Sequence, residues 1–176
     1  MATPTLFEIQ CALMSGVADH ASRNNQQINM YPVPEGWGLI DRQTKPSGFE
    51  ATYFAKTNAD GTKEIVIAFA PTNTKEMIDI ITDIESGLGN VTTQLLQAAE
   101  YYMKIRSENP NATITFTGHS LGGGIAALMG IFFNEKAVVF DQAPFAAGQT
   151  VEKRSYTSFP LSLGVAAYAK STPHFS

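Results

Sequence analysis

Cysteine is almost missing from this sequence, since Cys11 is the single one among 176 residues. One thiol supports neither a disulfide framework nor a metal site built from cysteines, and we expect Cys11 to be buried in a helix. Positive charge is also in short supply: 12 Lys and Arg stand against 16 Asp and Glu, and the net charge is −4 with no basic run. This balance argues against nucleic acid as a partner.

Long apolar runs and a leader sequence are missing as well. No stretch approaches the roughly 18 uninterrupted apolar residues of a membrane span, and residues 1–8 lack the positive and apolar regions of a signal peptide. We therefore expect a soluble product and leave its compartment open. Hydrophobic residues make up 44% of the chain, and this composition and length fit a single domain over residues 1–176.

Apolar periodicity and turn residues predict alternating helices and strands. Residues 6–23 carry Phe7, Cys11, Met14 and Ala18 at spacings of four, three and four, which is one face of a helix. Further strands are expected at 37–40, 51–55, 64–69, 113–117 and 137–140, and further helices at 74–84, 91–107, 125–133 and 161–170. This alternation predicts an α/β fold with a mainly parallel sheet and helices on both faces.

The segment 118–122 reads Gly-His-Ser-Leu-Gly and follows the predicted strand 113–117. It fits the Gly-x-Ser-x-Gly nucleophile elbow, in which a sharp strand-to-helix turn presents the serine above the sheet. The alternative is a glycine-rich turn that joins a buried strand to a helix, with or without phosphate on the helix N-terminus. A P-loop requires a Lys after its glycines, and none follows here.

Residues 114–124, Ile-Thr-Phe-Thr-Gly-His-Ser-Leu-Gly-Gly-Gly, closely resemble the elbow of α/β-hydrolase lipases, especially class 3 lipases and related bacterial lipases and phospholipases. The resemblance implies an α/β-hydrolase-like fold and a lipase- or phospholipase-like carboxylic ester hydrolase, with Ser120 as the catalytic nucleophile of an acyl-enzyme mechanism. It implies a lipid or other ester substrate, transient contact with a lipid surface, and no metal or organic cofactor. A serine thioesterase or acyltransferase stays an alternative, because the elbow is common to these enzymes.

The resemblance extends back to residues 68–72, Ala-Phe-Ala-Pro-Thr, which look like a divergent copy of the Phe-Arg-Gly-Thr-like turn of these lipases. By that match the backbone N–H groups of Thr72 and Leu121 form the oxyanion hole. Ala70-Pro71 departs from the usual Arg-Gly, and Pro71 restricts the backbone and removes an N–H. The alternative is that Thr72 begins a helix-capping turn.

The orienting acid has one good candidate, Asp141, which directly follows the predicted strand 137–140. Residues 140–144, Phe-Asp-Gln-Ala-Pro, are similar to the acid-bearing turn of pancreatic-type lipases, which implies a catalytic role for Asp141. Class 3 lipases instead place their acid one strand later and have Gly near this point. The alternative is therefore an aspartate that initiates a turn or caps a helix.

The base has no comparable candidate, because the chain has three histidines. His20 is predicted near the end of the first helix, His119 is the usual packing companion of the lipase elbow, and His174 has the expected chain order but lies close to the chain end. The resemblance covers about residues 64–145, and family members continue for one or two more strands that carry the histidine. We therefore expect the C-terminal part of the fold to be missing, and a catalytically inactive α/β-hydrolase-like binding domain is the rival interpretation.

Overall fold

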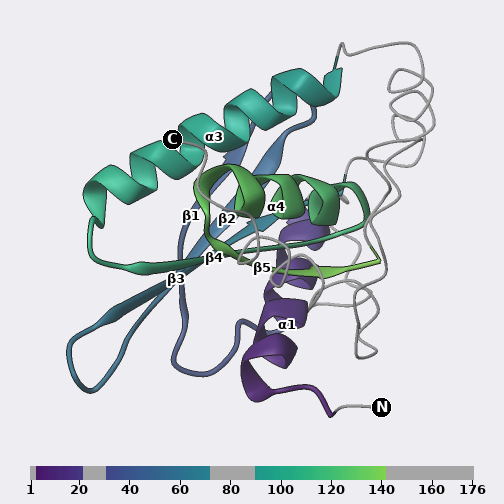
Figure 1. Ribbon diagram of the computed structural model, residues 1–176. Helices are drawn as coiled ribbons and strands as arrows, with labels where there is room; N and C mark the ends of the chain where they lie inside the picture. The colour runs from purple at the N-terminus through teal and green to yellow at the C-terminus, as the bar shows by residue number, and fades with distance from the viewer. Residues whose placement is uncertain (1–2, 22–30, 72–89, 142–176) are drawn as a thin grey trace.

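A computed structural model describes residues 3–21, 31–71 and 90–141 of the chain (Figure 1). Within these residues, a sheet of five strands has the order β1-β2-β3-β4-β5. The helices and strands follow one another as α1 (Leu6–Ala21), β1 (Gly38–Thr44), β2 (Glu50–Thr57), β3 (Lys63–Phe69), α3 (Asn90–Glu108), β4 (Thr113–His119), α4 (Ser120–Phe133) and β5 (Lys136–Phe140). The predicted α/β class is confirmed. The segments 74–84 and 161–170, which were predicted to be helical, lie outside the described residues.

The sheet is mixed, with an antiparallel half and a parallel half. β1 pairs with β2 and β2 with β3 in antiparallel orientation, whereas β3 pairs with β4 and β4 with β5 in parallel orientation. The antiparallel half follows from short connections: the Gly48 amide donates to the Lys45 carbonyl in one turn, and the Gly61 amide donates to the Asn58 carbonyl in the other. The predicted parallel arrangement therefore holds for β3, β4 and β5.

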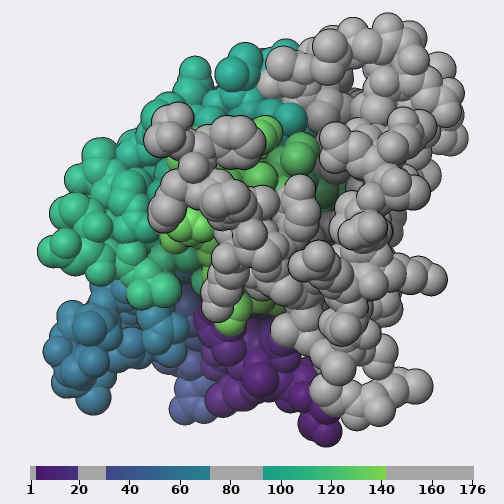
Figure 2. Space-filling model, in the orientation of Figure 1, coloured from purple at the N-terminus to yellow at the C-terminus, as the bar shows by residue number. Residues whose placement is uncertain are grey.

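Helices cover both faces of the sheet, as the sequence predicts. Along β3, Ile65, Ile67 and Phe69 pack with side chains of α3 and α4, whereas Val66 and Ala68 pack with α1. This alternation places a separate apolar core on each face. Figure 1 shows α3 and α4 above the sheet and α1 beneath it, and Figure 2 shows α3 in teal and α1 in purple on opposite sides of the molecule.

Helix α1 begins at a capping box that its sequence encodes. The Glu8 amide donates to Thr5 Oγ1 at 3.3 Å, and the Thr5 amide donates to the Glu8 carboxylate at 2.8 Å. This reciprocal pair satisfies two backbone donors at the helix start. Cys11 and Met14 are fully buried on the predicted apolar face, and burial raises the pKa of the Cys11 thiol to about 12. Cys11 is therefore a buried thiol, as expected.

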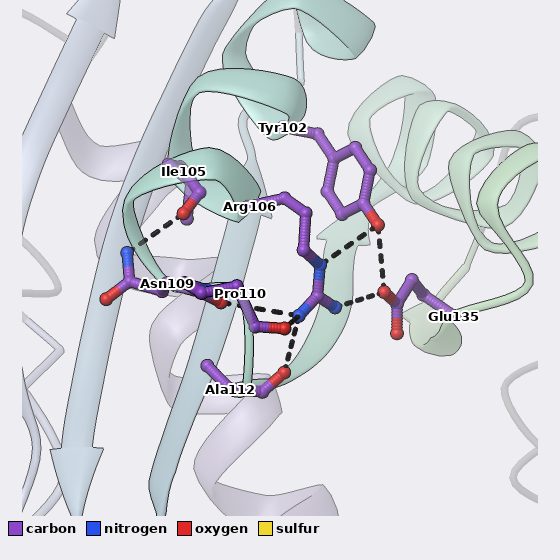
Figure 3. A network of polar contacts seen from close by, with 7 residues as sticks. All are labelled: Tyr102, Ile105, Arg106, Asn109, Pro110, Ala112 and Glu135. Atoms are coloured by element: carbon purple, nitrogen blue, oxygen red, sulfur yellow. Dashed lines mark hydrogen bonds and ion pairs between the residues drawn. The ribbon is translucent and has the colours of Figure 1, made fainter.

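Arg106 connects the end of α3 to the segments on either side of it (Figure 3). Its guanidinium donates to the Ala112 carbonyl at 2.7 Å, just before β4, and pairs with the carboxylate of Glu135 between α4 and β5. The Tyr102 hydroxyl donates to the same carboxylate at 2.9 Å, and the Tyr102 ring lies 4.3 Å from that of Phe133. The network therefore fixes the amino-terminal ends of the two parallel strands β4 and β5.

Candidate active site

Strand β4 passes into helix α4 without an intervening loop residue, and Ser120 lies at the junction. His119 ends the strand with extended backbone angles (φ −118°, ψ 147°), and Ser120 begins the helix with a φ of 54°. A positive φ is uncommon for a residue with a side chain, and such residues cluster at active sites. The backbone therefore has the geometry of a nucleophile elbow, with Ser120 half-buried at the carboxyl end of β4.

Both glycines of the motif are needed because backbone segments meet at the elbow. A Cβ atom on Gly118 would lie 2.4 Å from the backbone of Gly122. A Cβ atom on Gly122 would lie 2.2 Å from the carbonyl oxygen of Phe69 and 2.9 Å from the carbonyl carbon of Ala70. The first turn of α4 therefore packs directly against the carboxyl end of β3, where the segment that leads to Thr72 begins.

The structure describes one of the two predicted oxyanion-hole residues. Leu121 is the second residue of α4 and its side chain is buried. Its N–H belongs to the first turn, where helix geometry provides no acceptor within the helix and favours negative charge. Thr72 lies outside the described residues, and Pro71, which precedes it, is buried. The Ala70 amide donates to the Glu50 carbonyl at 3.0 Å, so the ladder of β2 and β3 continues to the residue before Pro71.

Asp141 directly follows β5 and is exposed, with a φ of 41°. Phe140 and His119 are register partners in the parallel pair of β4 and β5. Asp141 therefore emerges at the same sheet edge as Ser120, where sites of α/β proteins gather. A catalytic role requires Asp141 to lie at this edge of the sheet. The left-handed backbone of Asp141 also fits the alternative, since it is typical of an aspartate that forms a turn.

The histidines of the chain are described to different extents. His119 is half-buried at the end of β4. His20 lies within α1, but its side chain is not among those described, and His174 lies outside the described residues. The assignment of the base therefore stays a prediction.

Residues 3–21, 31–71 and 90–141 contain no group of three or more His, Cys, Asp or Glu side chains that could hold a metal ion. Over the same ranges, no helix has the length and apolar character to cross a membrane.

Thr117 is a further candidate, and it lies just before the Gly-x-Ser-x-Gly motif. It is fully buried in β4, and its Oγ1 donates to the carbonyl oxygen of Val138 in β5 at 2.6 Å. The run Thr113, Thr115, Thr117 places hydroxyls on one face of an otherwise apolar strand, and that alternation is the signal that could have drawn attention to it.

A family model described as a Tle-like phospholipase domain, within the phospholipase-like family, matches residues 33–168. Among curated proteins, ATG15 of Kluyveromyces lactis, named as a lipase, is 33% identical over 75 residues, which cover 43% of this chain and 13% of that protein. ATG15 of Saccharomyces cerevisiae, also named as a lipase, is 36% identical over 77 residues, which cover 43% of this chain and 14% of that protein.

Two solved lipase structures share the fold. The Lip2 lipase of Yarrowia lipolytica has a TM-score of 0.54 at 17% identity, with 77% of this chain and 57% of that chain covered. The lipase of Rhizopus microsporus var. chinensis has a TM-score of 0.53 at 16% identity, with 78% and 58% covered. The match thus spans little more than half of each lipase, and about an eighth of the ATG15 proteins.

Proposed function

The chain belongs to the phospholipase-like family, as a Tle-like phospholipase domain, and from this premise we propose that it hydrolyses an acyl ester of a lipid with Ser120 as the nucleophile. The observation that carries the proposal is the left-handed backbone of Ser120 between β4 and α4. Strain of this kind persists only where surrounding contacts hold it, and here the two glycines allow those contacts.

The reaction proceeds through an acyl-enzyme. Ser120 Oγ attacks the ester carbonyl carbon while a histidine takes the hydroxyl proton. The tetrahedral intermediate collapses when the bond to the alcohol breaks, and the histidine returns the proton to the departing oxygen. Water then attacks the acyl-Ser120 carbonyl by the same sequence, which releases the fatty acid and restores the serine.

The oxyanion is stabilised by the backbone N–H groups of Leu121 and Thr72. The Leu121 amide is supported by its place in the first turn of α4, beside the nucleophile. Thr72 is supported by the packing of Gly122 against Phe69 and Ala70, since Thr72 follows two residues after Ala70. Pro71 lacks an N–H, but the donor assigned here is the next residue. Loss of one such donor typically costs about 3 kcal/mol of transition-state stabilisation.

Asp141 is proposed to orient the histidine and to stabilise its protonated form. Its support is the sheet edge that it shares with Ser120. Within this chain His174 is the candidate base, because it is the one histidine that follows Asp141 in the sequence, in the Ser, Asp, His order of this fold. The alternative is a histidine on the later strands that family members carry.

Intact-mass labelling with a fluorophosphonate tests the proposal, because only an activated serine reacts quickly with this probe. We expect one adduct on the wild-type chain and none on Ser120→Ala. Loss of labelling in His174→Ala would identify the base. A folded wild-type protein that is not labelled would contradict a self-sufficient active site.

A further inference from the structure

The hydroxyl of Thr117 lies at the junction of three elements. Its Oγ1 is 2.6 Å from the carbonyl oxygen of Val138 in β5 and 3.4 Å from the carbonyl oxygen of Cys11 in α1. A hydroxyl has one proton to donate, and the shorter contact identifies Val138 as its acceptor. The residue is fully buried, so water does not compete for this bond.

The position of this bond relates it to the proposed active site. Thr117 and Val138 are register partners in the parallel pair of β4 and β5. Ser120 lies three residues beyond Thr117, and Asp141 lies three residues beyond Val138. A strand rises about 3.3 Å per residue, so the bond lies about 10 Å along the strands from both Ser120 and Asp141.

We infer that Thr117 is a positioning residue, whose buried hydroxyl holds the carboxyl end of β5 against β4 so that Asp141 stays aligned with the Ser120 elbow. The inference rests on the proposed function. Backbone ladder bonds set the register of the two strands, and the hydroxyl adds a side-chain bond that restrains shear and twist near their ends. Such restraint matters because a misplacement of about 1 Å can cost about 100-fold in rate.

The same strand provides a matched control. Thr115 lies two residues before Thr117 on the same face and is 2% exposed, and its register partner in β5 is Lys136. Within the described residues its hydroxyl makes no hydrogen bond. Thr115→Val and Thr117→Val therefore make the same chemical change at two buried sites, and only the second removes a bond between strands.

The test compares Thr117→Val, Thr117→Ser and Thr115→Val with the wild type. The readouts are the fluorophosphonate labelling rate, and kcat and KM for p-nitrophenyl butyrate. We expect Thr117→Val to lower the labelling rate and kcat by about tenfold or more with KM within about twofold, because the alignment of reacting groups changes and the substrate site does not. Thr117→Ser keeps the hydroxyl, and Thr115→Val keeps the bond from Thr117 to Val138. The labelling rate and kcat of both variants should therefore stay within about threefold of the wild-type values.

A double-mutant cycle tests whether Thr117 acts through Asp141. In an Asp141→Asn background, Thr117→Val should produce little further loss, since the group that it positions is already gone. A full tenfold loss in that background would overturn the inference. Should Thr117→Val not fold, Thr117→Cys carries the same test, because a thiol is a weak donor of similar size.

The outcomes separate this inference from the proposed function. A wild type that is folded and not labelled defeats the proposed function, and the positioning role falls with it. A labelled wild type with an unaffected Thr117→Val defeats the positioning role alone. An equal loss in Thr115→Val would show a general effect of core packing and would also overturn the inference.

Discussion

Ser120 and Asp141 are the first residues beyond two neighbouring parallel strands, and both have left-handed backbone, with φ angles of 54° and 41°. His119 and Phe140, which precede them, are register partners. Adjacent strands are about 4.8 Å apart, so the two backbones leave the sheet side by side. The proposed role of Asp141 as the orienting acid depends on this closeness to Ser120, and the first prediction tests that role.

Replacing Asp141 distinguishes its two interpretations. We expect Asp141→Asn and Asp141→Gly to lower kcat on the order of 10³- to 10⁴-fold, because loss of the orienting acid leaves the histidine misaligned. Asp141→Gly should also be more stable by about 1 kcal/mol, since glycine adopts positive φ without steric cost. Kinetics with p-nitrophenyl butyrate and urea unfolding measure the two effects. A stable Asp141→Gly variant with full activity would favour the turn-forming role.

The contact between Gly122 and the end of β3 predicts a large effect of a single methyl group. Gly122→Ala should lower stability by about 3 kcal/mol and abolish labelling of Ser120, because its Cβ would overlap the Phe69 carbonyl at 2.2 Å. Thermal unfolding would report this as a decrease in Tm of about 6–12 °C. Gly38→Ala is the control, since its nearest contact is 3.6 Å away. Similar Tm values for the two variants would contradict the prediction.

The Arg106 network predicts a difference between arginine and lysine. We expect Arg106→Met to lower the free energy of unfolding by about 3 kcal/mol, because the guanidinium is the shared donor to the Glu135 carboxylate and to the carbonyls of Asn109, Pro110 and Ala112. Arg106→Lys should recover little of this, since an ammonium lacks the planar fork. Urea denaturation measures both.

The partly exposed ion pair of Lys56 and Glu64 provides the control for the Arg106→Met variant. Its N–O distance is 3.4 Å and its side-chain exposure is 25% and 28%, which is close to that of Arg106 at 28%. Lys56→Met should cost about 1 kcal/mol, because its ion pair is partly exposed and the contact of Lys56 Nζ with the Trp37 ring, at 5.1 Å from the centroid, adds only modestly. If Arg106→Met lowered the free energy of unfolding no more than Lys56→Met does, the contacts of Arg106 with backbone carbonyls would contribute nothing to stability.

The buried Cys11 thiol predicts a pH dependence of stability above pH 9. Burial raises its pKa from 9.0 in the unfolded chain to about 12, so between these values the unfolded thiol ionises and the folded thiol stays protonated. The protonated thiol therefore contributes to the free energy of unfolding, and this contribution is complete below pH 9 and is lost as the pH rises toward 12. From pH 8 to 10.5 this loss amounts to about 2 kcal/mol.

Cys11→Ala removes this contribution and leaves those of the other titrating groups. We expect the free energy of unfolding of the variant to fall less steeply than that of the wild type over the same pH interval. Equal slopes would mean that the thiol titrates normally in the fold. In the native state near pH 8, Cys11 should also resist alkylation by iodoacetamide, since the thiolate is the reactive form.

Much of the fold could be predicted because its signals are local. The apolar face of α1, the β-branched run of β3 and the turns at Gly48 and Gly61 all lie within short windows of sequence. Helix α4 begins at Ser120, five residues before the predicted start at 125. The predicted start was too late because glycines 122–124 have low helix propensity. In the fold, tertiary contacts at the elbow override that propensity.

The candidate site could be predicted only as far as its motif. The Gly-x-Ser-x-Gly pattern located Ser120 and required small residues around it, and the structure confirms that requirement at Gly118 and Gly122. The bond from Thr117 to Val138 depends on which strand lies next to β4 and in what register. No local pattern encodes that neighbour, so this contact came from the fold alone.

The packing of Gly122 against Phe69 also determines when the elbow forms during folding. The two residues are 53 positions apart (122 − 69) in the sequence, and the pairing of β3 with β4 brings them together. Contacts between such distant positions form only after the cost of closing the intervening loop has been met. A nascent chain therefore carries the complete pentapeptide before it has a strained serine, and Ser120 acquires its left-handed geometry only when β3 and β4 have paired.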